Sequence, residues 1–350
     1  MPLLELTQDG LYCAWGGFYV DPWNPVDRAI VTHAHADHAR PGSRSYLTTV
    51  PGAAPLRACV GPDPAIQAVP YGEPLTLEDV TVSLHPAGHI LGSAQIRLEH
   101  RGEVWVVSGD YKLASDPTCT PFEPLRCHTF LTESTFGLPI FRWPPPEQTI
   151  DSIHCWWRAN QEAGKASVLF AYPLGKAQRV LAALYQRIGA VGPVYAHGAV
   201  EQVNCLYREQ GIALPPLARG SDWSRALILA PLDCRGSPWI RRFGPASTAF
   251  ASGWMRIRGT RRRRSLDRGF VLSDHADWPA LLEAIDATRA ETIWVTHGYR
   301  APLVRWLAEH GRQAIAVQTR FEGEQEDGNR DARQESSDAV SSGAIDEAQP

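Results

Sequence analysis

The chain has 350 residues, of which 44% are hydrophobic and 21% are charged, and its formal net charge is −4. These proportions are those of a globular protein and exclude a fibrous or wholly disordered chain. No uninterrupted apolar stretch could span a bilayer and no signal peptide is visible, so we expect a cytoplasmic protein with no membrane partner.

The distribution of charge and cysteine narrows the class further. Residues 322–350 carry nine acidic and two basic side chains, and removing this tail charge of −7 from the total of −4 leaves +3 for residues 1–321. We therefore predict a disordered acidic tail over residues 321–350. The seven cysteines include no CxxC pair, which argues against structural disulfides and a cysteine zinc site.

The order of apolar runs predicts three blocks. Up to residue 137 the pattern predicts mainly strands, at residues 18–20, 29–31, 80–84, 94–98 and 104–108. From about residue 147, strands at 168–171, 194–196, 226–229 and 249–251 alternate with helices at 177–188 and 200–210, as in a parallel α/β unit. The third block has a strand at 269–272, a helix with Asp277 as N-cap and Pro279 in its first turn, a strand leading to His297, another helix and a strand at 314–317.

Residues 32–38, which follow the predicted strand 29–31, concentrate metal-binding side chains. They read Thr-His-Ala-His-Ala-Asp-His. A strand that ends in a tight loop can turn several side chains toward one point, and imidazole nitrogen and carboxylate oxygen are good zinc donors. The candidate ligands here are His33, His35, Asp37 and His38.

Three further candidates, His89, Asp110 and His297, lie at or just past the ends of predicted strands. Neighbouring glycines let the backbone turn sharply there, and strand-end loops on a rigid sheet commonly carry catalytic sites. His297 must reach back along the chain to join Asp37 and His38. The blocks that flank the α/β insert therefore form one discontinuous domain, and the insert caps the metal cleft.

This set of ligand motifs resembles the metallo-β-lactamase superfamily. The resemblance implies an αββα sandwich that binds two Zn²⁺, with Mn²⁺ able to replace zinc in vitro, and a metal-activated hydroxide that attacks the substrate. It assigns His33, His35 and His89 to one zinc, Asp37, His38 and His297 to the second, and Asp110 to a bridge between them.

Short sequence motifs in and around the insert resemble those of the β-CASP branch, whose members process nucleic acids. These motifs lie at residues 132–137, 175–178, 251–255, 273–277 and 296–298. A finer similarity, over residues 254–259 and 267–275, is to the bacterial ligase-associated DNA exonuclease family. The implied domains are a metallo-β-lactamase domain over residues 1–140 and 260–320 and a β-CASP cap domain over residues 141–259.

The resemblance also implies roles for side chains beyond the ligands. Asp37, His275 and Glu133 are the expected catalytic residues: His275 hydrogen-bonds the scissile phosphate and protonates the leaving oxygen, and Glu133 fixes its tautomer. We expect substrate contacts from Lys176, Ser252, Arg256, Arg258, Arg261 and Arg262, with Trp254 or Trp239 stacking on a base. The alternative for the arginine-rich segment is a disordered loop that aids solubility.

The predicted function is a DNA exonuclease for single-stranded or end-frayed DNA, acting in repair with an ATP-dependent DNA ligase and a helicase. RNA processing by a β-CASP ribonuclease remains an alternative, because the branch's DNA nucleases usually lack the third-motif histidine and this chain has His297. Glu133 and His275 argue against a small-molecule metallo-hydrolase, which needs neither. The complete ligand set argues against an inactive nucleic-acid-binding scaffold.

Overall fold

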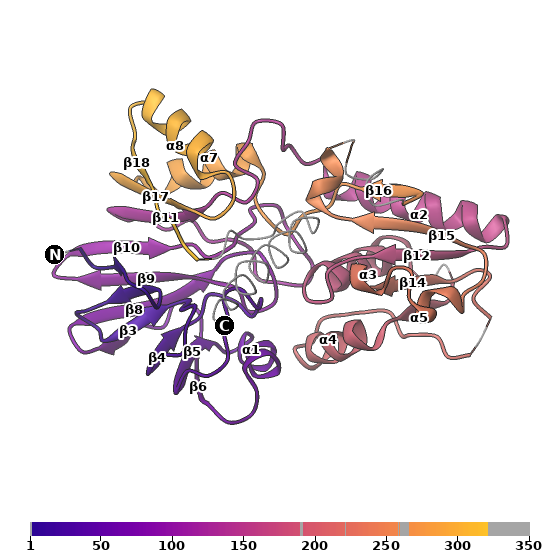
Figure 1. The fold of residues 1–350 in the computed structure, drawn as a ribbon, viewed down its shortest axis with the longest axis horizontal. Helices are drawn as coiled ribbons and strands as arrows, with labels where there is room; N and C mark the ends of the chain where they lie inside the picture. The colour runs from indigo at the N-terminus through magenta and orange to yellow at the C-terminus, as the bar shows by residue number, and fades with distance from the viewer. Residues whose placement is uncertain (1, 190–191, 221, 258, 260–265, 321–350) are drawn as a thin grey trace, which may run out of the picture.

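The computed structural model describes residues 2–189, 192–220, 222–257, 259 and 266–320. The chain forms two lobes, which we name after the predicted domains: the catalytic lobe is drawn mainly in indigo, purple and yellow, and the cap lobe is drawn in magenta to orange (Figure 1). Of the cysteines, all seven lie in described positions and are free. Among the described residues, no helix combines the length and apolar character that crossing a membrane requires.

The catalytic lobe contains two sheets packed face to face. The first has the order β1 (Glu5–Leu6), β2 (Leu11–Cys13), β3 (Phe18–Val20), β4 (Arg28–Ile30), β5 (Ser45–Thr49) and β6 (Ala65–Val69). The second has the order β18 (Gln313–Ala316), β17 (Thr292–Thr296), β11 (Thr129–Glu133), β10 (Glu103–Val107), β9 (Ala94–His100), β8 (Val80–Pro86) and β7 (Leu75–Leu77).

Apolar side chains from both sheets fill the space between them, among them Phe18, Leu84 and Trp105. Helices α7 (Trp278–Thr288) and α8 (Arg300–Glu309) bury Leu281 and Leu303 against the outer face of the second sheet, while α1 (Ala53–Val60) packs on the first. Each such side chain contributes roughly 1.5–3 kcal/mol when removed from water. The layers are helix, sheet, sheet, helix, and the predicted fold class is confirmed.

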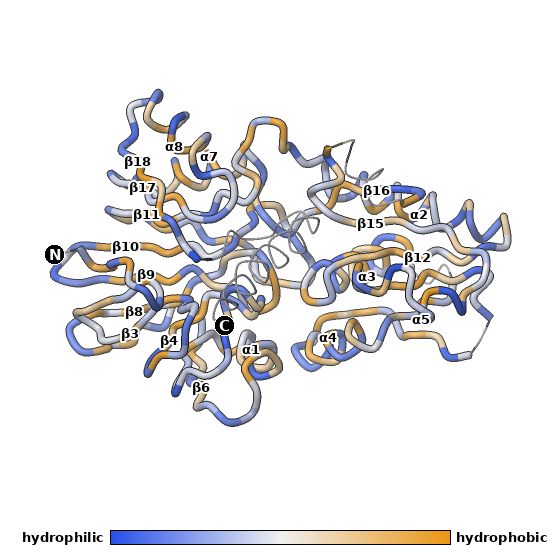
Figure 2. Tube along the Cα trace, in the orientation of Figure 1, coloured by the Kyte–Doolittle hydropathy of each residue, from blue (hydrophilic) through white to orange (hydrophobic). Residues whose placement is uncertain are grey.

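The cap lobe is built on one parallel sheet in the order β13 (Val194–Ala196), β14 (Leu227–Ala230), β12 (Ala166–Phe170), β15 (Ala246–Ala251) and β16 (Arg268–Phe270). Buried strands of this kind read as continuous apolar runs, and β12 and β14 are largely orange in Figure 2. Helices α2 (Pro146–Glu162), α3 (Lys176–Ile188) and α4 (Gly198–Glu209) share one core with the sheet. Short helices η1 (Leu232–Cys234), α5 (Pro238–Arg241) and η2 (Gly253–Arg256) complete the described part of the lobe.

The boundary between the lobes differs from the predicted one. The sequence predicts that the catalytic domain resumes at residue 260 with a strand over residues 269–272. Strand β16 instead ends at Phe270 and pairs with β15 of the cap sheet, Ala249 opposite Arg268. Since this pairing places β16 at the edge of the cap sheet, the chain returns to the catalytic lobe only through residues 271–277, which we call the return segment.

Candidate active site

In both sheets of the catalytic lobe, the candidate site residues follow the carboxyl ends of parallel strands. Strands β10, β11 and β17 are neighbours and parallel, so their carboxyl ends lie on the same edge. Asp110 follows β10, and Glu133 ends β11. His297 directly follows Thr296, the residue of β17 that pairs with Glu133. In the first sheet β3 and β4 are also parallel, and their ends lead to Asp21 and to the loop 32–38.

The first candidate metal cluster contains His33, His35, His89 and Asp110. The Nδ1 atom of His35 lies 3.1 Å from Nε2 of both His33 and His89. The Oδ2 atom of Asp110 lies 3.5 Å from Nε2 of His33 and 3.8 Å from Nε2 of His89. These are the residues that the resemblance assigns to one metal, and the structure brings them together.

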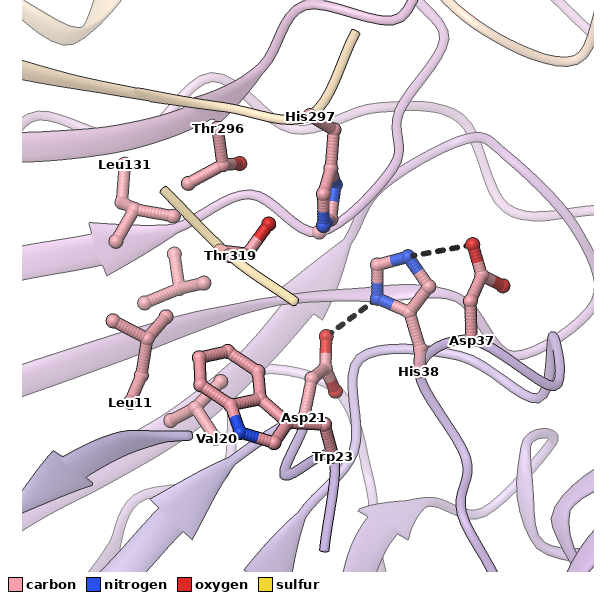
Figure 3. Close-up of a pocket in the computed structure, with 12 residues that line it drawn as sticks. Leu11, Val20, Asp21, Trp23, Asp37, His38, Leu131, Thr296, His297 and Thr319 are labelled. Carbon is pink, nitrogen blue, oxygen red and sulfur yellow. Dashed lines mark hydrogen bonds and ion pairs between the residues drawn. The ribbon is translucent and has the colours of Figure 1, made fainter. Parts of the chain in front are cut away.

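The second cluster contains His38, Asp110 and His297. Nε2 of His38 lies 3.5 Å from Oδ2 of Asp110, and Nδ1 of His297 lies 3.9 Å from Oδ1 of Asp110. Asp37 stands beside them, with Oδ2 at 3.9 Å from Nε2 of His38 (Figure 3). Asp37, His38 and His297 line a pocket at this point, and Trp23 and the apolar side chains of Leu11, Val20 and Leu131 complete its wall.

Three polar atoms of the second cluster are buried and have no hydrogen-bond partner within the described part of the chain. They are Nε2 of His38, Oδ1 of Asp110 and Nδ1 of His297. Such orphan atoms cost free energy unless they bind something, and all three are metal-ligating atom types that face one another. The residues therefore fit a divalent metal.

The pKa shifts of the candidate ligands agree with this fit, except that of His38. Burial lowers the pKa of His33 and of His89 well below the usual value, and it also lowers the pKa of His297. Burial alone would raise the pKa of Asp110, but His38 and His275 outweigh it and hold the pKa well below its usual value. Neutral imidazoles around an ionised carboxylate are the protonation states that metal ligation requires, and His33, His89 and His297 meet this condition. Burial alone would lower the pKa of His38, but Asp110, Asp37 and Asp21 raise it well above its usual value, so this ring must release a proton when a metal binds.

His275 and Glu133 form a buried pair beside the clusters. Nδ1 of His275 lies 2.9 Å from Oε2 of Glu133, and the main-chain N–H of Tyr111 donates to Oε1 of Glu133 at 2.8 Å. With Asp110 the pair makes a third group of ligand-type atoms within 4.8 Å of one another. Because the carboxylate already accepts from His275, we interpret this group as a pair that orients the imidazole.

Asp21 is a site residue that the sequence analysis missed. Its Oδ2 lies 2.7 Å from Nδ1 of His38 and accepts from Oγ1 of Thr32 at 2.6 Å, while its Oδ1 accepts from the main-chain N–H of Thr32. The bond to His38 leaves Nε2 of that ring for a metal. The signal was present, since Asp21 directly follows a short apolar strand, and Asp110 also lies just past the end of one.

The expected substrate contacts have mixed positions. Lys176 is buried, with Nζ at 3.5 Å from Oδ2 of Asp274, and Ser252 is buried with its hydroxyl accepting from the N–H of Trp254. Arg256 is exposed, and its Nε donates to the carbonyl of Ile140.

The other expected substrate contacts are the two tryptophans and three further arginines. Trp254 packs in a buried aromatic cluster with Phe136, which leaves its ring enclosed. The ring of Trp239 is half-buried. Its centroid lies 4.8 Å from the ring centroid of His197 and 4.6 Å from Cζ of Arg242. Arg258, Arg261, Arg262 and the acidic tail lie outside the described residues.

Asp277 is the N-cap of α7, as predicted. Its Oδ1 accepts from the N–H of Ala280, and its Oδ2 accepts from the N–H of Trp143. The carboxylate thus caps the helix and ties the return segment to the irregular segment that precedes α2, which is a structural role.

Comparison with known proteins gives relatives along most of the chain. A probable DNA ligase from Opitutus terrae is 32% identical over 323 residues, which cover 91% of this chain and 31% of that protein. The transcription termination factor FttA from Pyrococcus abyssi is 28% identical, over 52% of this chain and 34% of that protein. RNase aCSPSF2 from Saccharolobus solfataricus is 28% identical, over 39% of this chain and 28% of that protein. The chain therefore spans about a third of the length of the curated relatives it matches.

No protein-family model matches the chain. A crystal structure of a protein of unknown function from Enterococcus faecalis has a TM-score of 0.53 at 12% identity, over 85% of this chain and 80% of that one. At this identity the likeness concerns the fold alone.

Proposed function

Because the chain belongs to the β-CASP branch of the metallo-β-lactamase superfamily, we propose that it is a metal-dependent nuclease that digests DNA from an end. The observation that carries the proposal is Asp110, which belongs to two metal-ligand clusters and lies next to the pair formed by His275 and Glu133. A site that holds two metals beside an oriented imidazole is suited to phosphodiester hydrolysis.

The side chains of the site would have two roles, metal binding and proton transfer. Bound divalent metals would polarise the phosphodiester and lower the pKa of a water molecule. His33, His35 and His89 would hold one metal, Asp37, His38 and His297 the other, and Asp110 both. His275, with Nδ1 engaged by Glu133, would present Nε2 to a phosphate oxygen or to the leaving oxygen, which can take up its proton.

We propose zinc as the native metal. The first cluster supplies three imidazoles and one carboxylate, and nitrogen-rich sets of this kind favour zinc over magnesium or calcium. Manganese would substitute best at the second position, where Asp37 adds a carboxylate. Equilibrium binding of each metal to the metal-free protein would test the order of affinity.

The relatives supply the argument for DNA. The relative that covers 91% of the chain is named a probable DNA ligase, which supports DNA as the substrate and a functional association with a ligase in repair. The helicase association rests on the resemblance alone. RNA processing is the second candidate, since another relative is named an RNase and His297 occupies the second cluster.

We further propose that residues 1–140 with 260–320 act as the catalytic domain and residues 141–259 as the cap, apart from β16, which pairs within the cap sheet. Arg256 is the one proposed contact with an exposed side chain among the described residues of that set. Arg258, Arg261 and Arg262 stay in the proposal on sequence grounds. The seven free cysteines suit a reducing, cytoplasmic setting.

The test is digestion of end-labelled single-stranded DNA and of RNA with the same sequence, by the wild type and by Asp110→Asn and His275→Ala variants. Shortening of DNA but not RNA, lost in both variants, supports the proposal and reveals the direction of digestion. Preferred digestion of RNA selects the second candidate. Activity that survives Asp110→Asn overturns the assignment of the site.

A further inference from the structure

The two candidate metal clusters are held by different parts of the protein. In the second cluster His38 is oriented by Asp21, which belongs to the catalytic lobe. In the first cluster His35 donates from Nε2 to the main-chain oxygen of Leu174 at 3.2 Å, and His89 donates from Nδ1 to the main-chain oxygen of Asp274 at 2.9 Å. Leu174 follows β12 of the cap sheet, and Asp274 lies in the return segment after β16.

Gln178, in the first turn of α3, braces the carbonyl of Leu174. Its Nε2 donates to the main-chain oxygen of Pro173 at 2.9 Å, and its Oε1 accepts from the N–H of Gly175 at 2.9 Å. These two bonds fix the peptide units on both sides of Leu174. Gln178 is fully buried, so solvent does not compete for them.

Arg179, the next residue of α3, braces the return segment. Its Nη1 donates to the main-chain oxygen of Ser273 at 2.5 Å, and its Nε lies 3.1 Å from Oδ2 of Asp116. Nζ of Lys112 donates to the same oxygen of Ser273 at 2.6 Å. Two side-chain donors thus hold the carbonyl that immediately precedes Asp274. The bond from the charged guanidinium of Arg179 is charge-assisted and therefore stronger than a neutral one.

We propose that Gln178 and Arg179 are positioning residues through which docking of the cap completes the first metal site. An imidazole that donates from one nitrogen to a fixed carbonyl keeps the other nitrogen unprotonated and aimed at the metal. The cap and the return segment that Arg179 braces hold two of the three imidazoles of the first cluster in this way. Among the described residues, the imidazoles of the second cluster make no such bond to the cap or to the return segment. The inference rests on the proposed function in taking the first cluster as a metal site.

The experiment measures metal affinity at each site separately. A His297→Ala background leaves the first cluster intact, and a His33→Ala background leaves the second. Arg179→Lys and Gln178→Met are introduced into both backgrounds. Lysine retains the charge of Arg179 but cannot donate to Ser273 and pair with Asp116 from one planar group.

The matched control is Arg187→Lys, on the same helix. Arg187 is exposed, and its Nε and Nη2 donate to the two carboxylate oxygens of Asp151 at 2.6 and 2.7 Å. Among the described residues it bonds neither the carbonyl of Leu174 nor that of Ser273. Zn²⁺ affinity is read by competition with a chromophoric chelator, and unfolding midpoints are recorded alongside.

We expect both variants to weaken Zn²⁺ binding about 10–100-fold in the His297→Ala background and to change it less than about threefold in the His33→Ala background. In the otherwise wild-type chain kcat should fall while KM is unchanged, since both side chains are buried. Equal weakening of both sites, or of neither, overturns the inference. If the His297→Ala protein itself binds no Zn²⁺, the proposed function fails instead.

Discussion

The Nδ1 atom of His275 lies 2.9 Å from Oε2 of Glu133, although 142 positions separate the two residues in the sequence. Glu133 ends β11, and His275 lies in the return segment, so the pair forms only when the chain has left the catalytic lobe, built the cap and come back. Both side chains are buried. Burial raises the pKa of Glu133, and His275 opposes that rise.

Glu133→Gln should therefore impair turnover without removing metal. The amide retains the shape of the side chain but no longer provides a charged acceptor for the imidazole, so we expect kcat to fall about 10–100-fold. Turnover on an oligonucleotide and metal content by elemental analysis check this. Glu147→Gln, at an exposed position in the first turn of α2, is the control and should behave as the wild type. A loss of metal in Glu133→Gln would make it a ligand instead.

Asp21→Asn should weaken the second metal site. The carboxylate of Asp21 lies 2.7 Å from Nδ1 of His38 and anchors Thr32 through two bonds, so an amide at this position loses the charge that orients the ring. We expect about 10–100-fold weaker binding of the second metal. Titration of the His33→Ala background, in which only the second site remains, measures it. Asp27 is exposed, so Asp27→Asn is the control. Equal affinities of the second site for metal in the Asp21→Asn and Asp27→Asn variants would refute the role of Asp21.

Asp274 predicts a pH-dependent stability. Burial raises the pKa of this carboxyl, but Lys176 and Arg179 outweigh burial and lower it from 3.8 to about 2. The folded state then binds fewer protons than the unfolded state between these values. Asp274 accordingly stabilises the protein fully above pH 3.8, and this contribution, about 2 kcal/mol, is lost as the pH falls through 2.

The comparison that checks it is denaturant unfolding of the wild type and of Asp274→Asn from pH 7 to pH 2. The difference in unfolding free energy between the wild type and Asp274→Asn should be largest above pH 4 and should decrease by about 2 kcal/mol toward pH 2. A gap that stays constant with pH would show that the ion pairs of Asp274 add no such stability.

Gly175→Ala should disturb the contact between the lobes. A Cβ atom at Gly175 would lie 2.4 Å from Cγ2 of Ile90, which adjoins the ligand His89, and the glycine has a φ of +95°. Gly164 is the matched control, since its φ is +63° and nothing lies within 4 Å of its Cβ position. Gly164→Ala should cost about 1 kcal/mol from backbone strain alone, and Gly175→Ala should cost more and also weaken the first metal site.

Arg256→Ala should reduce the salt dependence of nucleic-acid binding. An exposed guanidinium that neutralises one phosphate contributes a slope of about one to the fall of log affinity with log salt concentration. Binding to single-stranded DNA over a range of salt concentrations measures the slope. Arg305→Ala on α8, where Arg305 is 81% exposed and pairs with Glu309, is the control. If the slope of log affinity against log salt concentration is the same in Arg256→Ala and Arg305→Ala, Arg256 does not bind a phosphate.

Much of the fold was predictable because its signals are local. Strand β3 and strand β13 lie where short apolar runs predicted them, and Asp277 caps α7 through its own side chain. Helix α2 was missed, although Ile150, Ile153 and Trp157 recur at helical spacing, because prolines and tryptophans obscure that pattern. Strand β16 was assigned to the wrong lobe because the choice of a pairing partner depends on strands that are distant in sequence.

The sequence by itself determined the chemistry of the site: which side chains can ligate metal, and that they stand at strand ends. Those are properties of residue type and of local chain direction. Only the tertiary structure decided how they are oriented. The carbonyls of Leu174 and Asp274 act as hydrogen-bond acceptors for His35 and His89, and every residue has a carbonyl, so no sequence pattern distinguishes these two. Whether Lys176 meets solvent or an ion partner was likewise decided by the docking of the lobes, which buries its charge against Asp274.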